Sequence, residues 1–232
     1  MAMAMKVKPR ILVLASGDAK GGGSGFQELV EFSRTDPRIL DATIVGVVSH
    51  HENGGVAQKA HDLKVPFLCW AGTFDATGYQ ELVKYFSADW VMCSGWLKPV
   101  RGLDPGRTIN IHPGPLPRFG GRGMWGHHVH EAVMAAYRRG EVTQSAVTMH
   151  YVTEHPGPDP YDKGPIIFEF PVLIRKNDTP DTLASRVNEK ERAWQSFILN
   201  LVVHEAIVLT GDGVHYHEEA DRLIKRAAKQ NR

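Results

Sequence analysis

An Asn-x-His pair, Asn110 and His112, stands in the run INIHPGPLPRF, and Pro113 follows it at once. Side chains two residues apart on a strand project from the same face, so the amide and the imidazole would point together. Pro113 disfavours helical backbone at His112 and holds it extended. An amide beside an imidazole can donate hydrogen bonds to an oxygen that becomes negative, and the imidazole can move a proton near neutral pH. The pair therefore predicts a reaction centre, although a histidine that only closes a strand end has the same pattern.

Two carboxylates follow in the turn-rich segment EHPGPDPYDKG, at Asp159 and Asp162. A carboxylate near an imidazole can raise its pKa, orient it, or accept a proton through water. Aspartates are also common turn formers, so the residues alone leave both interpretations open.

A glycine-rich stretch, SGDAKGGGSGF, precedes the first expected helix and contains Gly22, Gly23, Ser24 and Gly25. Glycines let backbone amides converge at a helix N-terminus, where an anion is favoured, so a phosphate could bind here. The stretch lacks the Gly-Lys-Ser/Thr of a P-loop and the spacing of a dinucleotide fingerprint.

Short apolar runs alternate with amphipathic ones in the part of the chain that must position these groups. This alternation predicts an α/β fold with an open, mostly parallel sheet. The expected strands are 10–16, 43–49, 65–70, 90–94 and 108–112, and the expected helices are 24–33, 53–63, 75–86 and 126–138. Ligands bind at the carboxyl ends of the strands in such sheets, which is where Asn110 and His112 would lie.

The second half predicts a C-terminal antiparallel strand pair, 145–153 and 165–174, joined across the EHPGPDPYDKG loop. A long helix is expected over 179–209, with Thr179 as its cap and Pro180 at its first position. No composition break divides the chain, so we expect a single domain over 1–232 with flexible ends at 1–9 and 218–232.

The formal charge of +1 and the pI near 7.9 give no sign of a nucleic-acid partner. No run approaches the roughly 20 apolar residues of a spanning helix, so we expect no membrane segment and a cytoplasmic protein. His127, His128 and His130 have no carboxylate at ligand spacing, so we expect them to be exposed or helix-capping and expect no metal site. Trp96 and Trp125 are candidates for pocket walls, with core packing as the alternative.

Four segments together resemble the folate-dependent formyltransferases, and most closely their single-domain glycinamide ribonucleotide formyltransferases. These segments are NIHPGPLPRF, HYVTE, DKGPII and SRVNEKERA. The resemblance covers roughly residues 10–217 and implies a Rossmann-like, open twisted sheet with helices on both faces. It also implies transfer of the formyl group of 10-formyltetrahydrofolate, used as a co-substrate, to the amine of glycinamide ribonucleotide in purine biosynthesis, by a monomer or homodimer.

The resemblance implies roles for particular residues. Asn110 and a protonated His112 would polarise the formyl oxygen and stabilise an oxyanion, while Asp162 would hold the imidazole or a relaying water. The substrate phosphate would bind at Gly22, Gly23, Ser24 and Gly25, and the substrate would also contact Glu191. The folate pocket would be lined by Trp96, Leu97, Lys98, Pro99, Val100 and Asp159.

Three departures from the family pattern leave the acceptor amine and the formyl donor open. The glycine loop is longer than usual and has Gly25 where Asn is usual, RGMW is inserted before GHHVH, and PGPDPY expands the loop before Asp162. The alternatives are a 10-formyltetrahydrofolate hydrolase, a formyltransferase for another amine, and a catalytically silent nucleotide- or folate-binding module.

Overall fold

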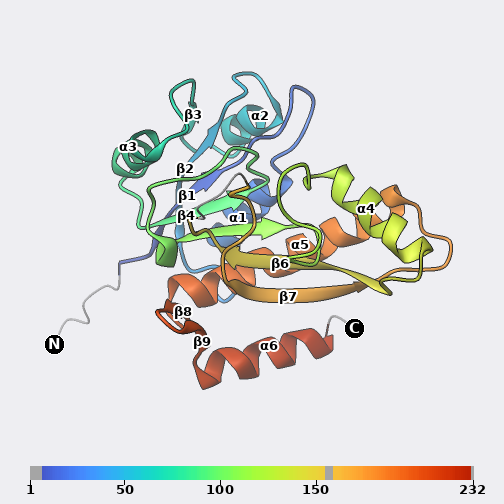
Figure 1. Cartoon of the computed structure of the whole chain (residues 1–232). Helices are drawn as coiled ribbons and strands as arrows, with labels where there is room; N and C mark the ends of the chain where they lie inside the picture. The colour runs from blue at the N-terminus through green and yellow to red at the C-terminus, as the bar shows by residue number, and fades with distance from the viewer. Residues whose placement is uncertain (1–6, 155–158, 231–232) are drawn as a thin grey trace.

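The computed structural model describes residues 7–154 and 159–230. Figure 1 shows an open, twisted sheet with helices on both faces, and its seven strands follow the order β3-β2-β1-β4-β5-β6-β7. Neighbouring strands are parallel from β3 to β5, whereas β6 pairs antiparallel with both β5 and β7. The strands are β1 (Arg10–Leu14), β2 (Thr43–Ser49), β3 (Phe67–Cys69), β4 (Trp90–Ser94), β5 (Thr108–His112), β6 (Gln144–Tyr151) and β7 (Ile166–Leu173).

The connecting helices confirm the predicted α/β alternation. They are α1 (Ser24–Thr35), α2 (Gly55–Asp62), α3 (Ala76–Phe86), α4 (His127–Arg138) and α5 (Pro180–Val203), with a short 3₁₀ turn, η1 (Pro105–Arg107), before β5. The bounds of β2, β4 and β5 are those expected from sequence, and β6 and β7 form the predicted antiparallel pair. The predicted fold class is therefore confirmed.

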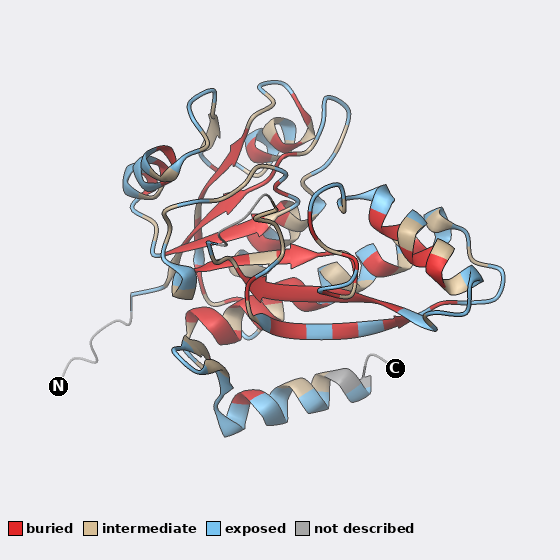
Figure 2. Cartoon of the chain, viewed as in Figure 1, coloured by how far each residue is buried: buried red, intermediate tan, exposed pale blue. Residues whose placement is uncertain are grey.

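Strand β1 shows why the sheet is buried on both faces. Ile11 and Val13 face the larger core beneath α1, α4 and α5, whereas Leu12 and Leu14 face a second core beneath α3. All four side chains are at most 1% exposed, and Figure 2 shows buried residues throughout the central strands. A strand covered on both faces is expected to have the continuous apolar sequence that RILVL has.

The long helix starts as predicted and ends earlier. The Thr179 side chain accepts a hydrogen bond from the Thr182 amide at 3.2 Å, and Pro180 occupies the first turn. The helix stops at Val203, and Glu205 takes a left-handed φ of 60° that a helix cannot continue through. The prediction of helix to residue 209 is thus wrong, because β8 (Ile207–Thr210) and β9 (Gly213–Tyr216) form a hairpin there. The TGDG turn between two β-branched runs is the hairpin signal in the sequence.

The C-terminal segment, expected as a flexible end, contains helix α6 (Glu218–Gln230). Figure 1 shows this helix running below β7, on the opposite side of that strand from α4. Ala220 is fully buried, and Ile224 packs partly buried against the larger core. Of the expected flexible ends, residues 1–6 and 231–232 lie outside the described residues. None of the helices within 7–154 and 159–230 combines the length and apolar character needed to cross a membrane.

Candidate active site

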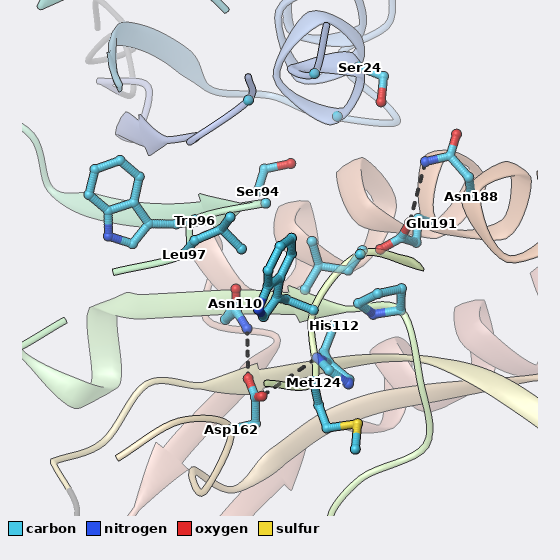
Figure 3. Close-up of a pocket in the computed structure, with 18 of the residues that line it drawn as sticks. Ser24, Ser94, Trp96, Leu97, Asn110, His112, Met124, Asp162, Asn188 and Glu191 are labelled. Atoms are coloured by element: carbon cyan, nitrogen blue, oxygen red, sulfur yellow. Dashed lines mark hydrogen bonds and ion pairs between the residues drawn. The ribbon is translucent and has the colours of Figure 1, made fainter. Parts of the chain in front are cut away.

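A cavity of about 610 Å³ opens at the carboxyl ends of β1, β4 and β5. The chain leaves β1 for β2 on one side and returns to β4 on the other, so the cavity lies at the switch point where open α/β sheets bind ligands. The loops after these strands, the segment before α4 and one face of α5 form its walls, as Figure 3 shows. It brings together Asn110, His112 and Asp162 with Gly22, Gly23, Ser24, Gly25 and Glu191, all of them predicted site residues.

Asn110 is held by His150, a residue to which sequence analysis gave no role. The two are register partners across β5 and β6, and Asn110 Nδ2 lies 3.0 Å from His150 Nε2. His150 Nδ1 lies 2.9 Å from the Tyr151 carbonyl, which can only accept, so Nε2 is the acceptor for the amide. Nδ2 also donates to Asp162 Oδ1 at 3.3 Å, which fixes the orientation of the amide and turns its oxygen away from Asp162 (Figure 3). The HYVTE segment of the family resemblance begins at His150, but the sequence did not show that His150 meets Asn110, because the pairing of β5 with β6 was unknown.

Asp162 links the three groups of the reaction centre. Its Oδ2 lies 3.6 Å from His112 Nδ1 and accepts a hydrogen bond from the Gly121 amide at 3.0 Å. Burial raises the pKa of Asp162, but its polar contacts, among them the neighbouring His112 and the hydrogen bond from the Gly121 amide, outweigh burial and leave the pKa below its usual value. Asp162 is therefore a carboxylate at neutral pH. Its φ of 54° is left-handed, which Asp and Asn adopt more readily than most residues.

His112 is buried on the cavity floor and oriented from both ring nitrogens. Its Nε2 donates to the Phe119 carbonyl at 2.7 Å, which leaves Nδ1 facing Asp162. Burial lowers the pKa of His112, and the Asp162 charge and the Phe119 carbonyl only partly oppose this effect. The neutral imidazole is thus the favoured form in this structure, whereas the family resemblance implied a protonated one. A proton that reaches Nδ1 would place a positive charge directly beside the Asp162 carboxylate.

The glycine loop closes the opposite end of the cavity. Gly22 and Gly23 have φ of 90° and 75°, and Ser24 begins α1. A Cβ at Gly25 would lie 2.3 Å from Ser94 Oγ, so this position admits only glycine without movement. Gln195 holds Ser94 in this place, because its side chain accepts a hydrogen bond from Ser94 Oγ at 2.8 Å and donates to the Gly25 carbonyl at 3.0 Å. Ser94 and Gln195 together leave room only for glycine at this position, where the family usually has Asn.

The extra residues of this loop are fixed rather than loose. The Asp18 side chain accepts hydrogen bonds from the amides of Lys20 at 2.7 Å and Gly21 at 2.8 Å. The Asp18 carbonyl accepts from the amide of Gly55, the first residue of α2, at 3.1 Å. The lengthened loop is therefore fastened to the start of the neighbouring helix, and its glycines still reach the cavity.

Glu191 lies on the wall formed by α5, facing the glycine loop across the cavity. Burial raises its pKa to about 7, and a contact of 3.4 Å with Asn188 Nδ2 only partly opposes this. A carboxyl group with this pKa changes charge near neutral pH. Arg192, the next residue, also lines the cavity and adds a cation to this end.

The predicted folate-binding residues divide between the cavity and its surroundings. Trp96 and Leu97 line the cavity, and Trp96 Nε1 donates to the Tyr79 hydroxyl at 2.9 Å. Lys98, Pro99 and Val100 are not among the lining residues. Lys98 Nζ lies 5.4 Å from the centre of the Phe74 ring, and Val100 packs against the core beneath α3.

Asp159 is also not among the residues that line the cavity, and its carboxylate binds backbone amides instead. Its Oδ1 accepts hydrogen bonds from the amides of Arg122 at 3.0 Å and Tyr161 at 3.3 Å. Part of the PGPDPY expansion, residues 156–158, lies outside the described residues. The described part thus supports the segment before α4, which is itself a wall of the cavity.

The histidines around the start of α4 differ from one another. His127 and His128 are exposed and lie 3.7 Å and 3.2 Å from the Glu131 carboxylate. His130 is 5% exposed, so the expectation of an exposed or capping residue is wrong for it, because helix periodicity turns it toward the core. Burial lowers the pKa of His130 to about 4. Within 7–154 and 159–230, no group of three or more His, Cys, Asp or Glu side chains is arranged to hold a metal ion.

Comparisons with known proteins agree with this fold. The model of the formyl transferase family matches residues 9–199, and the chain belongs to that family. It is 33% identical over 205 residues to a chloroplastic phosphoribosylglycinamide formyltransferase of Arabidopsis thaliana, covering 84% of this chain and 66% of the relative. It is 26% identical to the phosphoribosylglycinamide formyltransferase of Bacillus subtilis, covering 78% of this chain and 90% of the relative.

A solved structure agrees as well. Glycinamide ribonucleotide transformylase 1 from Symbiobacterium toebii superposes with a TM-score of 0.74 at 26% identity, covering 91% of this chain and 95% of that one. The chain spans about two thirds of the length of the plant relatives, at 66%, 62% and 64% of the three.

Proposed function

We propose that this protein transfers the formyl group of 10-formyltetrahydrofolate to the amine of glycinamide ribonucleotide, a step of purine biosynthesis. One observation carries the proposal: a single cavity holds the Asn110–His112–Asp162 centre at one end and the glycine loop and Glu191 at the other. A phosphate at the loop and a formyl group at the centre would let the acceptor amine reach the formyl carbon. The names of the relatives support the same acceptor and the transfer of a formyl group.

The reaction starts with His112 neutral, as its lowered pKa favours. The amine attacks the formyl carbon, a C–N bond forms, and the carbonyl electrons move to the formyl oxygen. The amine proton passes to His112 Nδ1, directly or through water, and the imidazolium is stabilised by the Asp162 carboxylate 3.6 Å away. The charge on His112 thus develops together with the negative charge on the oxygen.

The oxyanion is stabilised by Asn110 and His112. The Nδ2 contact with Asp162 is the longer of the two that Asn110 makes, at 3.3 Å against 3.0 Å to His150, so an oxyanion can compete for that hydrogen. The intermediate then collapses, the bond from the formyl carbon to the folate nitrogen breaks, and that nitrogen takes up the proton held by His112. Tetrahydrofolate leaves, and no covalent bond to the enzyme is needed.

The test is to incubate the protein with 10-formyltetrahydrofolate, with and without glycinamide ribonucleotide, and to follow the release of tetrahydrofolate. We expect release that depends on the amine. We also expect His112→Ala to lower the rate by about a thousandfold, within the range for loss of a general acid-base group, while tetrahydrofolate binding is retained.

Other outcomes would identify the alternatives. Release at the same rate without the amine indicates a hydrolase, and release with a different amine indicates another acceptor. Binding of tetrahydrofolate without turnover indicates a silent module. The compartment and the oligomeric state stay predictions, and the plant relatives are chloroplastic proteins.

A further inference from the structure

The Gly120–Gly126 segment, which contains the inserted RGMW, forms a wall of the cavity for which the proposed function gives no use. Arg122, Met124 and Trp125 are among the lining residues. Trp125 is 49% exposed, whereas Trp96, on another wall, is 8% exposed and bonded to Tyr79. Half of the Trp125 side chain is thus open at a cavity wall, which is unusual for a residue that buries well.

The segment is anchored at both ends, so Trp125 has a defined place. At one end the Gly121 amide donates to Asp162 and the Arg122 amide donates to Asp159, each at 3.0 Å. At the other end the Trp125 ring meets the His128 ring edge-on, with centres 4.9 Å apart at an angle of 90°. Gly121, which donates to Asp162, precedes Trp125 by four residues, and the Met124 amide closes the intervening turn on the Gly121 carbonyl at 3.0 Å. The indole is therefore tied to the reaction centre through few residues.

The chemistry of the two substrates indicates what an indole could bind here. In 10-formyltetrahydrofolate, the nitrogen that carries the formyl group is bonded directly to the p-aminobenzoyl ring. Any arrangement that brings the formyl carbon to Asn110 and His112 also brings this flat ring beside the reaction centre. Glycinamide ribonucleotide contains no aromatic ring. Aromatic rings stack on one another in offset or edge-on arrangements, and an indole presents a large surface for this.

We propose that Trp125 stacks on the p-aminobenzoyl ring of the formyl donor and thereby contributes to selecting that donor. This assignment rests on the proposed function, since the donor is named there. Trp125 acts on binding and takes no part in the transfer of protons. The insertion that departs from the family pattern then has a role in recognising the donor.

The experiment measures the affinity of the protein for tetrahydrofolate by titration calorimetry, without acceptor, in Trp125→Leu and Trp125→Phe. We expect the dissociation constant to rise about fivefold in the Leu variant and by less than about twofold in the Phe variant, which keeps a ring. Two smaller probes separate the parts of the donor: p-aminobenzoylglutamate should lose affinity in the Leu variant, and 6-methyltetrahydropterin, which lacks the aryl ring, should not. Tyr85→Leu is a matched control, because Tyr85 is 73% exposed on α3 and is not a cavity residue.

Two results would overturn the assignment: an unchanged tetrahydrofolate affinity in Trp125→Leu, or an equal loss of affinity for the pterin probe. The proposed function fails in a different way. If the wild type binds tetrahydrofolate but transfers no formyl group, and Trp125→Leu still weakens that binding, the stacking assignment stands without the activity. If the wild type binds no tetrahydrofolate at all, both proposals fall.

Discussion

The reaction centre takes its groups mainly from paired strands, whereas the acceptor end of the same cavity takes them from a glycine loop and a helix. Asn110 and His150 are register partners in adjacent strands, and Asp162 joins them at 3.3 Å and 3.4 Å. At the other end, Glu191 contacts Asn188 at 3.4 Å, and the glycine loop presents backbone groups whose placement depends on left-handed φ angles. The side chains of the proposed reaction centre thus hold one another in place. At the proposed acceptor end, the charge of Glu191 changes with pH, and the position of the glycine loop depends on how Gly25 packs.

The largest effect is expected from Asp162→Asn. Asn tolerates the left-handed backbone at this position and keeps the shape of the side chain, but it removes the charge that stabilises protonated His112. We expect kcat to fall about a thousandfold, as for loss of a proton-transfer partner. Steady-state kinetics measure this, and Asp159→Asn, in the same loop, is the control with little change in kcat. A variant with a tenth of the wild-type kcat would contradict the role of Asp162.

His150→Phe tests whether the strand partner positions Asn110. The substitution keeps an aromatic ring of similar size and removes the acceptor of the Asn110 amide, which leaves a buried donor without that partner. We expect kcat to fall about tenfold, which corresponds to about 1.4 kcal/mol, with KM for both substrates nearly unchanged.

The conservative variant His150→Gln separates positioning from general damage. It restores an acceptor and should recover part of kcat. A rise in KM equal to the fall in kcat, or no recovery with Gln, would mean that His150 serves packing alone.

Gly25→Ala tests the acceptor end through backbone placement. Its Cβ would lie 2.3 Å from Ser94 Oγ and 3.1 Å from Gln195, so the first turn of α1 must shift away from the phosphate site. We expect KM for the ribonucleotide to rise about fivefold, in line with loss of one charge-assisted hydrogen bond, while kcat changes less.

Gly21→Ala is the matched control for this variant, because its Cβ would meet only Asp18 Oδ1, at 3.9 Å, and φ there is not left-handed. If the two variants behave alike, the loop does not bind the phosphate through its precise backbone position.

The smallest effect is expected from the charge on Glu191. Its pKa is raised to about 7, so the carboxyl group is ionised above pH 7 and gains a proton as the pH falls through that value. The protonated form is a weaker acceptor, so KM for the ribonucleotide should rise about threefold between pH 8 and pH 6. In Glu191→Gln this dependence should disappear, and its persistence would assign it to another group.

The fold could be predicted from sequence wherever the pattern was local. The run RILVL, buried on both faces, and the Thr179–Pro180 start of the long helix are signals contained in a few adjacent residues. The hairpin after Val203 was missed because an apolar, β-branched run at the end of a long helix fits either structure. The residue with left-handed φ after this helix is Glu205, so the glycine that often marks a helix end is missing from the sequence here.

The sequence by itself predicted the composition of the proposed reaction centre. Spacing and the proline constraint indicated that Asn110 and His112 would point together at a strand end, and the family resemblance added Asp162. Only the tertiary structure decided the rest, since strand register brought His150 to Asn110, and packing placed Ser94 and Gln195 where a Gly25 side chain would be. It also tied the Gly120–Gly126 segment to Asp162, which made Trp125 a wall of the cavity. The physical reason is that spacing along the chain fixes only neighbours within an element, whereas these contacts join residues about 40 or more positions apart, whose meeting depends on how the strands pair.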